Sequence, residues 1–412
     1  MGTDEIDVVI VGAGQAGLAM SHELSGLGIE HEILERADAV GNSWAARWDS
    51  FCLVTPNTCL TLPGGEYSGD QPDGYLRRDE VVQHLADYAA SLAVPVRTGI
   101  EITSLLPQAD QRLALTTAGG DSIVAREVIV ATGGLRAAYR PPWAAEVRSL
   151  PVLDASQYRN PDSLPPGGVL VVGSGQTGCQ LAEELITGGR RVIQACGRAP
   201  WMPRRIEGRD TFDWVGQTGF FDQTLADVPV GPAVRFMANP QATGRDGGHD
   251  LTTRTLQAMG VELAGHVAAV ENGRVTFAGD LAASVAFSDA RWADLRDAIR
   301  GSQLALGRRA PSFSEVDPFD ASAELVRLDL REIASILVTT GFRPAYRAWI
   351  DIPSAFDSMG FPRQVDGRST IVPSLSFIGV PFMRTRASQL LMGVGRDAAI
   401  GARGVAARLN AA

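Results

Sequence analysis

The chain has 412 residues, enough for roughly two or three domains, and its composition of 45% hydrophobic and 20% charged residues is typical of a globular protein. The formal net charge of −10 gives no indication of a basic surface for nucleic acid or anionic membranes, and neither is expected as a partner. The sequence contains no Lys, which excludes Schiff-base chemistry and a P-loop lysine.

The N-terminus is acidic and runs directly into an apolar segment, and no apolar stretch reaches the ~18 residues of a membrane helix. We therefore expect a cytoplasmic protein without membrane contact. None of the cysteines forms a C-x-x-C pair, so neither a redox disulfide nor a zinc ribbon is predicted. The five histidines are scattered without metal-ligand spacing, and no metal site is expected.

The first motif that carries chemistry lies at the start of the chain. An apolar run at 8–11 leads into the turn Gly12–Gly17, a helical pattern to Leu27 and a second strand that ends on Glu35. This is the context in which G-x-G-x-x-G binds a dinucleotide, with the pyrophosphate on the helix N-terminus and the acid on a ribose hydroxyl. The acid would repel a 2′-phosphate, so the pattern favours FAD or NAD over NADP. The alternative is an ordinary glycine-rich turn.

The segment after Glu35 contains Arg36, Trp44, Arg47 and Trp48. Its tryptophans and arginines could clamp a ring system and a phosphate, or the tryptophans could simply pack in the core. An amphipathic helix is predicted over 79–92, and short strands follow between residues 96 and 125. A buried strand at 128–131 then runs into a glycine turn that contains Thr132 and Gly133.

The opening pattern recurs at a strand over 169–172, the turn Gly173–Gly178 and a further helix and strand. No acid ends this second strand. Arg198 stands there instead, with Arg204 and Arg205 shortly after it. Arginine at this point can bind a 2′-phosphate bidentately, which predicts NADP, although each arginine alone could be a solvated surface charge.

The remaining segments give weaker signals. Residues 136–166 are rich in Pro and Arg and are expected to form a linker, and 288–301 is predicted to be helical. Aromatic residues between 212 and 236 could line a substrate pocket, with core packing as the alternative. A second strand-to-glycine turn at 336–344 contains Thr340 and Gly341, a buried strand at 375–380 contains Gly379, and a last helix ends near Leu409.

Together these motifs resemble those of the flavin-containing monooxygenases (class B flavin monooxygenases), which carry two dinucleotides. The resemblance implies an α/β fold with two Rossmann-like domains, the NADPH domain being inserted into the FAD domain. The implied division is an FAD-binding part at 1–150, an NADPH-binding part with a substrate-side insertion at 165–330, and a return to the FAD domain at 331–412.

The resemblance also implies site residues. The first fingerprint would bind FAD and the second NADPH, with Gly379 and Gln389 near the isoalloxazine ring. The family fingerprint F-x-G-x-x-x-H is degraded here, because Arg148, Leu150 and Asp154 replace Phe, Gly and His. Asp154 and a loosely matching Asn57 are the expected catalytic residues. The expected cofactor-binding residues are Gly12, Gly14, Gln15, Ala16, Gly17, Glu35, Arg36, Trp44, Arg47, Thr132, Gly133, Gly173, Ser174, Gly175, Gln176, Thr177, Gly178, Arg198, Arg204, Thr340, Gly341, Gly379 and Gln389.

Three functions are open at this point. The resemblance favours an NADPH-dependent FAD monooxygenase that transfers one oxygen atom from O2 to nitrogen or sulfur of a small organic substrate, through a C4a-(hydro)peroxyflavin. The degraded fingerprint favours an NADPH-dependent flavoprotein reductase or dehydrogenase without oxygen transfer. The third hypothesis is a non-catalytic FAD-binding sensor. The sequence leaves the oligomeric state open, with a homodimer as one option.

Overall fold

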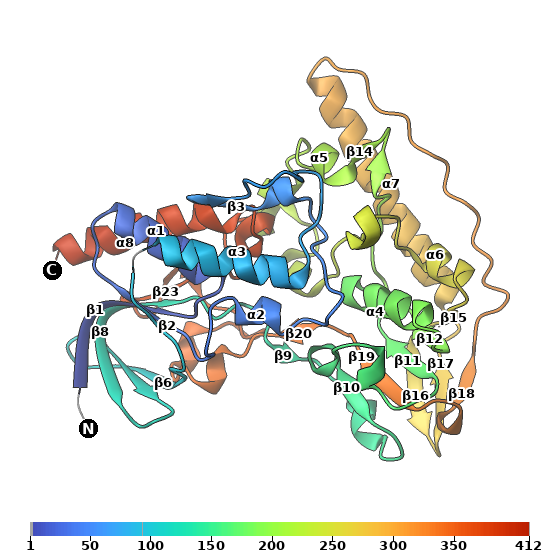
Figure 1. The fold of residues 1–412 in the computed structure, drawn as a ribbon, viewed down its shortest axis with the longest axis horizontal. Coiled ribbons are helices and arrows are strands. Elements are labelled where there is room, and N and C mark those ends of the chain that lie inside the picture. The colour runs from blue at the N-terminus through green and yellow to red at the C-terminus, as the bar shows by residue number, and fades with distance from the viewer. Residues whose placement is uncertain (1–2, 93, 412) are drawn as a thin grey trace.

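The computed structural model describes residues 3–92 and 94–411 as two α/β units that lie side by side (Figure 1). The helices are α1 (Gln15–Gly26), α2 (Asn42–Ala45), α3 (Arg78–Ser91), α4 (Gln176–Thr187), α5 (Thr211–Val215), α6 (Thr253–Ala258), α7 (Leu281–Ala305) and α8 (Val394–Ala411). Short 3₁₀ turns connect many of the elements. None of the helices in the described ranges is long and apolar enough to cross a membrane.

The first unit is built on a sheet with the order β21-β22-β23-β8-β1-β2-β5, to which β6 and β7 add an antiparallel hairpin. Its strands are β1 (Thr3–Val11), β2 (Glu32–Leu34), β5 (Val96–Arg97), β6 (Ile102–Pro107), β7 (Leu113–Thr117), β8 (Ser122–Val130), β21 (Gln364–Val365), β22 (Arg368–Ser369) and β23 (Leu375–Phe377). The central strands are parallel, and α1, α3 and α8 cover one face of them (Figure 1). A small hairpin of β3 (Thr61–Leu62) and β4 (Gly65–Glu66) lies beside this layer.

The second unit contains a parallel sheet with the order β10-β19-β11-β12-β15. Its strands are β10 (Val152–Asp154), β11 (Val169–Val172), β12 (Val192–Ala195), β15 (Glu262–Ala264) and β19 (Ser335–Val338). An antiparallel sheet of β16 (Val267–Glu271), β17 (Arg274–Phe277) and β18 (Arg327–Asp329) packs beside it, and β13 (Arg205–Ile206) pairs with β14 (Arg209–Asp210).

The two parallel sheets repeat one arrangement. In the first, β1 lies between β2 and β8; in the second, β11 lies between β12 and β19. The strand order therefore confirms the expected fold of two Rossmann-like units, the second inserted into the first. The expected boundary at residue 331 is wrong by one strand, because β19 pairs with β10 and β11 in the second sheet.

Two chain segments connect the units, and they pair with each other. β9 (Ala137–Ala138) and β20 (Phe342–Arg343) form an antiparallel ribbon, so the exit from the first unit lies beside the return to it. Residues 136–166, expected to be a linker, also contain β10 and several 3₁₀ turns. The helix expected over 288–301 is longer at both ends, because α7 keeps an apolar face from Leu281 to Ile299.

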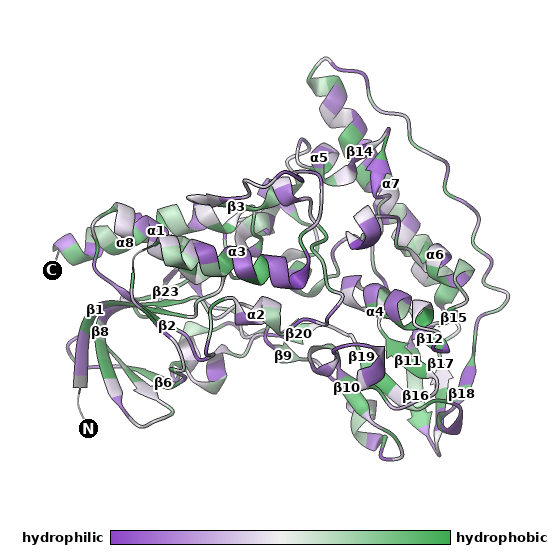
Figure 2. Cartoon of the chain, viewed as in Figure 1, coloured by the Kyte–Doolittle hydropathy of each residue, from purple (hydrophilic) through white to green (hydrophobic). Residues whose placement is uncertain are grey.

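The hydrophobic pattern explains why these segments form buried strands. β11 and β12 are buried at every position, as expected for a parallel sheet covered on both faces. Figure 2 shows hydrophobic residues along the central strands of both units, while the helices alternate between hydrophobic and hydrophilic faces. One continuous core joins the units, since it contains Val8 and Ile10 of β1 together with Val169 and Val171 of β11.

Candidate active site

The glycines of the first motif have two different structural roles. Gly12 has φ +109°, and a Cβ there would lie 2.8 Å from the Ala131 carbonyl oxygen. A Cβ on Gly17 would lie 1.9 Å from the Gly12 carbonyl oxygen, so these two glycines are required by packing within the protein. Gly14 has an ordinary φ of −86°, and its Cβ would meet only the Ser43 hydroxyl, at 4.0 Å. Gly14 therefore leaves room for a ligand.

The glycines of the second motif have the same two structural roles. A Cβ on Gly173 (φ +115°) would lie 2.8 Å from Thr339 Oγ1, and one on Gly178 would lie 2.1 Å from the Gly173 carbonyl oxygen. Gly175 has φ −70°, and its Cβ would meet only the Ala238 methyl group, at 3.6 Å. In both motifs the middle glycine keeps space open directly in front of a helix N-terminus, where a phosphate is favoured.

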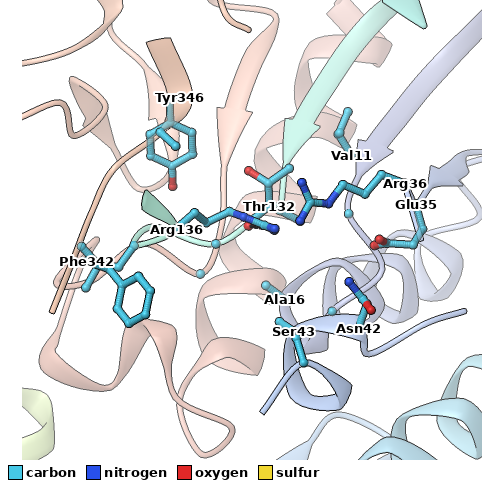
Figure 3. Close-up of a pocket in the computed structure, with 18 of the residues that line it drawn as sticks. Val11, Ala16, Glu35, Arg36, Asn42, Ser43, Thr132, Arg136, Phe342 and Tyr346 are labelled. Carbon is cyan, nitrogen blue, oxygen red and sulfur yellow. Dashed lines mark hydrogen bonds between the residues drawn. The ribbon is translucent and has the colours of Figure 1, made fainter. Parts of the chain in front are cut away.

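A cavity of about 590 Å³ opens at the first motif (Figure 3). The structure places twelve of the expected residues on its wall: Gly12, Gly14, Gln15, Ala16, Glu35, Arg36, Arg47, Thr132, Gly133, Thr177, Gly379 and Gln389. The wall thus combines β1, β2, the turn after β8 and the returning C-terminal segment. This convergence requires the inserted topology, because Gly379 and Gln389 are far from the first motif in sequence.

Glu35 is held at the edge of this cavity by backbone groups. Its carboxylate accepts hydrogen bonds from the N–H of Ala13 at 2.8 Å and of Ala37 at 2.9 Å. The acid therefore has a fixed orientation beside the turn, as a ribose-binding carboxylate needs. Figure 3 shows the side chains of Arg36 and Arg136 extending toward one another near Thr132, which makes this part of the cavity cationic.

Arg47 supplies a further positive charge to the same cavity. Burial lowers the pKa of its guanidinium, and no carboxylate of residues 3–92 or 94–411 forms an ion pair with it. A half-buried cation that lacks a carboxylate partner favours an anionic ligand. Together with the space in front of Gly14, Arg47 fits the pyrophosphate of a dinucleotide.

A second cavity, of about 910 Å³, opens at the second motif. Nine expected residues lie on its wall: Gly173, Ser174, Gly175, Gln176, Thr177, Arg198, Thr340, Gly341 and Gln389. The Ser174 hydroxyl accepts a hydrogen bond from the Gly197 N–H at 2.9 Å and donates to the Gly197 carbonyl at 3.0 Å. A neutral hydroxyl thus ties this strand end to its turn, where the first motif uses the Glu35 carboxylate. Arg198 is exposed beside it and can receive a 2′-phosphate.

The two cavities meet. Five residues line both of them: Leu135, Ala155, Thr177, Phe342 and Gln389. A dinucleotide bound at each glycine motif would therefore extend toward a shared boundary between the two units.

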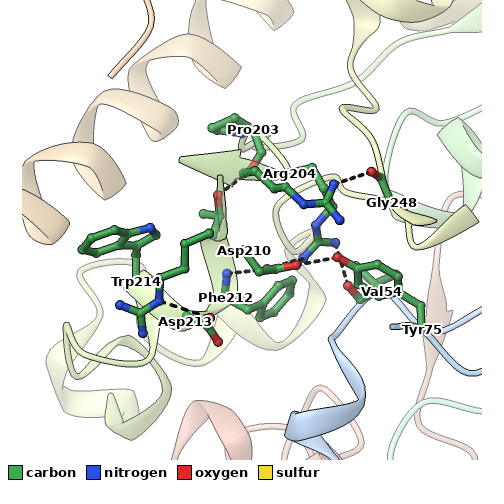
Figure 4. A network of polar contacts seen from close by, with 12 residues as sticks. Val54, Tyr75, Pro203, Arg204, Asp210, Phe212, Asp213, Trp214 and Gly248 are labelled. Carbon is green, nitrogen blue, oxygen red and sulfur yellow. Dashed lines mark hydrogen bonds and ion pairs between the residues drawn. The ribbon is translucent and has the colours of Figure 1, made fainter. Parts of the chain in front are cut away.

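Arg204 does not reach either cavity, which corrects the expectation that it binds a 2′-phosphate. Its side chain is 2% exposed, and its guanidinium binds both Asp210 carboxylate oxygens, at 2.5 and 2.6 Å (Figure 4). The same guanidinium donates to the Val54 carbonyl at 2.8 Å and lies over the Tyr75 ring at 4.9 Å. Arg204 therefore joins the second unit to the 54–75 segment of the first.

Neither expected catalytic residue faces the cavities. Asn57 is buried, donates to the Gln71 carbonyl at 2.9 Å and accepts from the Leu76 N–H at 2.8 Å, so it shapes a loop. The Asp154 carboxylate is bound bidentately by Arg140, at 2.7 and 3.0 Å. It also caps the short turn that carries Ala155 into the cavity wall, so its effect on the site is indirect.

Three other expected cofactor residues act through their neighbours. The Trp44 indole N–H donates to Gln15 Oε1 at 2.9 Å, and Gln15 itself lines the first cavity. Gly17 and Gly178 lie beneath the turns rather than on the cavity walls, because their missing side chains let the helices approach the turn backbone.

Sequence reasoning assigned no role to several residues that line the cavities, most clearly Arg136, Arg343 and Arg386. The sequence signal for Arg386 was its position three residues before Gln389. The signal for Arg136 and Arg343 was that each follows a strand-to-glycine turn closely.

Comparison with known proteins agrees with this geometry. Residues 9–209, which span both glycine motifs, match the pyridine nucleotide-disulphide oxidoreductase family. An uncharacterized CzcO-like oxidoreductase of Geobacillus kaustophilus is 29% identical over 395 residues, which cover 95% of this chain and 96% of that protein. The indole-3-pyruvate monooxygenase YUCCA1 of Oryza sativa is 29% identical over 209 residues, which cover 50% and 51% of the two chains.

Among solved structures, the flavin-containing monooxygenase of Stenotrophomonas maltophilia superposes with a TM-score of 0.68 at 21% identity, over 98% of this chain and 99% of the other. The expected resemblance to flavin-containing monooxygenases is thereby confirmed at the level of the fold. The expectation of an oxidoreductase is confirmed as well, and the two cavities fit the two dinucleotides that such a fold implies.

Proposed function

We propose that this oxidoreductase, which has the fold of the flavin-containing monooxygenases, is an NADPH-dependent FAD monooxygenase. NADPH, a proton, O2 and a small organic substrate would give NADP⁺, water and the substrate carrying one added oxygen atom. FAD would occupy the first cavity and NADPH the second. A nucleophilic nitrogen or sulfur remains our preferred oxygen acceptor.

The meeting of the two cavities carries this proposal. Thr177 and Gln389 come from different units and line both cavities, so each motif can direct its dinucleotide to the same boundary. Bound FAD would supply the electron transfer and the oxygen activation, chemistry that side chains lack. Glu35 would orient one ribose, Arg47 would neutralise a pyrophosphate and Arg198 would select the 2′-phosphate. Apolar Leu135 and Phe342 at the boundary favour exclusion of water.

A thiol-dependent reductase is the competing function, because the matched family is named for disulphide oxidoreductases. The four cysteines of the described chain are free, and none of them lies on the wall of either cavity. Burial raises the pKa of Cys52 and Cys59 to about 11 and that of Cys179 to about 12. Such thiols stay protonated and are poor nucleophiles, which disfavours a thiol relay.

The proposal is tested by measuring how many oxygen atoms the substrate gains for each NADPH oxidised. The purified protein is loaded with FAD and supplied with NADPH and ¹⁸O2, with and without small amines, thioethers and ketones. We expect at least one substrate to gain one ¹⁸O atom per NADPH oxidised, with a matching fall in hydrogen peroxide release. NADPH oxidation that always yields stoichiometric hydrogen peroxide, whatever the added compound, would contradict oxygen transfer.

A further inference from the structure

The charged side chains that line the second cavity are all of one sign. Among the described residues, four arginines and His266 line it, and no Asp or Glu does. This is unexpected in a chain whose formal net charge is −10. A large cavity with cations and without carboxylates favours anionic occupants.

Three of the four arginines have an expected ligand or an observed partner within the protein. Arg198 stands at the strand end where the 2′-phosphate is expected. Arg235 is bound to the Pro381 carbonyl at 3.1 Å and lies 3.6 Å from an Asp357 carboxylate oxygen, so its charge is already compensated. Arg343 is stacked on the Tyr139 ring at 4.2 Å, beside the ribbon that joins the two units.

Arg386 has no carboxylate partner among the described residues. Its guanidinium lies over the Phe220 ring at 4.1 Å and the Phe382 ring at 4.8 Å. Its only side-chain acceptor among the described residues is Gln223 Oε1, at 2.9 and 3.2 Å, which is uncharged. Burial lowers the pKa of Arg386 to about 10, so the group stays cationic at neutral pH.

Arg386 lies in a different part of the cavity from Arg198, where the 2′-phosphate end of the dinucleotide is expected. Arg198 stacks on Phe287 of α7, whereas Arg386 contacts Phe220 and belongs to the turn that ends in Gln389. Gln389 lies at the boundary shared with the first cavity. The free cation is therefore near the place where the two cofactors would meet, and aromatic side chains surround it.

We infer that the substrate is an organic acid with an apolar or aromatic body, whose carboxylate binds Arg386. This inference rests on the proposed function, since it names the substrate class of that site. A guanidinium binds a carboxylate through charge-assisted hydrogen bonds, and Nη1 of Arg386 has no hydrogen-bond acceptor among the described residues, since Nε and Nη2 are the atoms that donate to Gln223. The neighbouring phenylalanines, including Phe221, would contact the apolar body.

Calorimetric binding tests the inference without turnover. The protein with bound FAD and NADP⁺ is titrated with phenylacetate and with phenylacetamide, which has the same body and no charge. We expect wild-type protein to bind phenylacetate at least tenfold more tightly than the amide. Arg386→Gln should weaken phenylacetate binding roughly 10- to 100-fold and leave the amide unaffected, while Arg386→Lys restores part of the loss.

Arg396→Gln is the matched control, because it removes the same charge from the neighbouring α8, where Arg396 is exposed and pairs with Asp222 at 2.9 Å. It should leave both affinities unchanged. Equal binding of acid and amide by wild-type protein would overturn the inference whether or not any variant folds. A rise in the NADPH KM of anaerobic flavin reduction in Arg386→Gln, with acid binding intact, would assign Arg386 to the dinucleotide and also overturn it.

The inference and the proposed function fail separately. Phenylacetate binding that depends on Arg386, in a protein that never transfers oxygen, would leave the acid site standing and remove the monooxygenase. Oxygen transfer to neutral or cationic substrates alone would support the monooxygenase and overturn the acid site.

Discussion

The Glu35 carboxylate accepts a hydrogen bond from the Ala13 backbone N–H at 2.8 Å, and the equivalent link in the second unit is made by the Ser174 hydroxyl with Gly197. The two units thus tie the same strand end to the same turn with different chemistry. A carboxylate repels a 2′-phosphate, and a hydroxyl does not. This difference supports FAD at the first motif and NADPH at the second.

The glycine at the centre of the first motif gives a sharp prediction. Gly14→Ala adds a methyl group that meets no protein atom closer than 4.0 Å, so we expect an unchanged melting temperature of the apoprotein and a large loss of bound FAD. Gly17→Ala places a methyl group 1.9 Å from the Gly12 carbonyl oxygen and should destabilise the fold by about 1–3 kcal/mol.

Flavin absorbance per protein and urea unfolding of the apoproteins distinguish these two effects. Gly14→Ala protein that retains full FAD would remove the first motif from the FAD site. A Gly17→Ala protein as stable as wild type would show that the turn can move away from the helix.

Coenzyme selection should depend on Arg198. We predict that Arg198→Gln raises the KM for NADPH roughly 10- to 100-fold and changes the KM for NADH much less, because only NADPH carries the 2′-phosphate. Steady-state NADPH and NADH oxidation with the same preparation measures both values. An equal change for the two coenzymes would place the 2′-phosphate elsewhere.

Substitution of Arg204, in contrast, should change the stability of the protein and not its coenzyme selection. Arg204→Gln leaves the Asp210 carboxylate buried without its partner, and breaking such an ion pair costs about 3–5 kcal/mol. We expect a large fall in the free energy of unfolding, measured with urea, and an unchanged ratio of the NADPH and NADH KM values. A change in that ratio without loss of stability would return Arg204 to the coenzyme site.

The cysteines provide a pH-dependent prediction. Burial raises the pKa of Cys52 and Cys59 from 9.0 to about 11, so the folded protein holds protons that the unfolded chain loses. Stability from these groups is complete below about pH 9 and declines as the pH rises toward about 11. At neutral pH, iodoacetamide should modify the four thiols only after unfolding, as read by mass spectrometry. Rapid modification of the native protein would reopen the thiol-reductase hypothesis.

Much of the fold could be predicted from sequence because its signals are local. Each glycine motif lies between a buried strand and a helix, and Glu35 follows its strand directly, so the patterns themselves specify the two Rossmann-like units. The assignment of β19 was wrong because its apolar sequence fits either sheet. Only the pairing with β10 and β11 decides between them.

The site was less predictable because side-chain partners come from distant segments. Arg198 and Arg204 look equivalent in the sequence, yet Asp210 and the Val54 carbonyl bury one of them and leave the other at a cavity. The aromatic contacts of Arg386 could not be predicted from its position near Gln389, since its neighbours Phe220 and Phe382 lie on different parts of the chain. Asp154 was misjudged because Arg140 could not be recognised as its partner from spacing.

The most direct test of the account is rapid mixing of the reduced protein with oxygen. Protein with bound FAD is reduced anaerobically by NADPH and mixed with aerated buffer, and the near-ultraviolet and visible absorbance are followed together. We predict complete reduction by NADPH, followed by a transient near-ultraviolet band before the oxidised flavin spectrum returns. Direct return to oxidised flavin, with one hydrogen peroxide released per NADPH, would contradict the monooxygenase account.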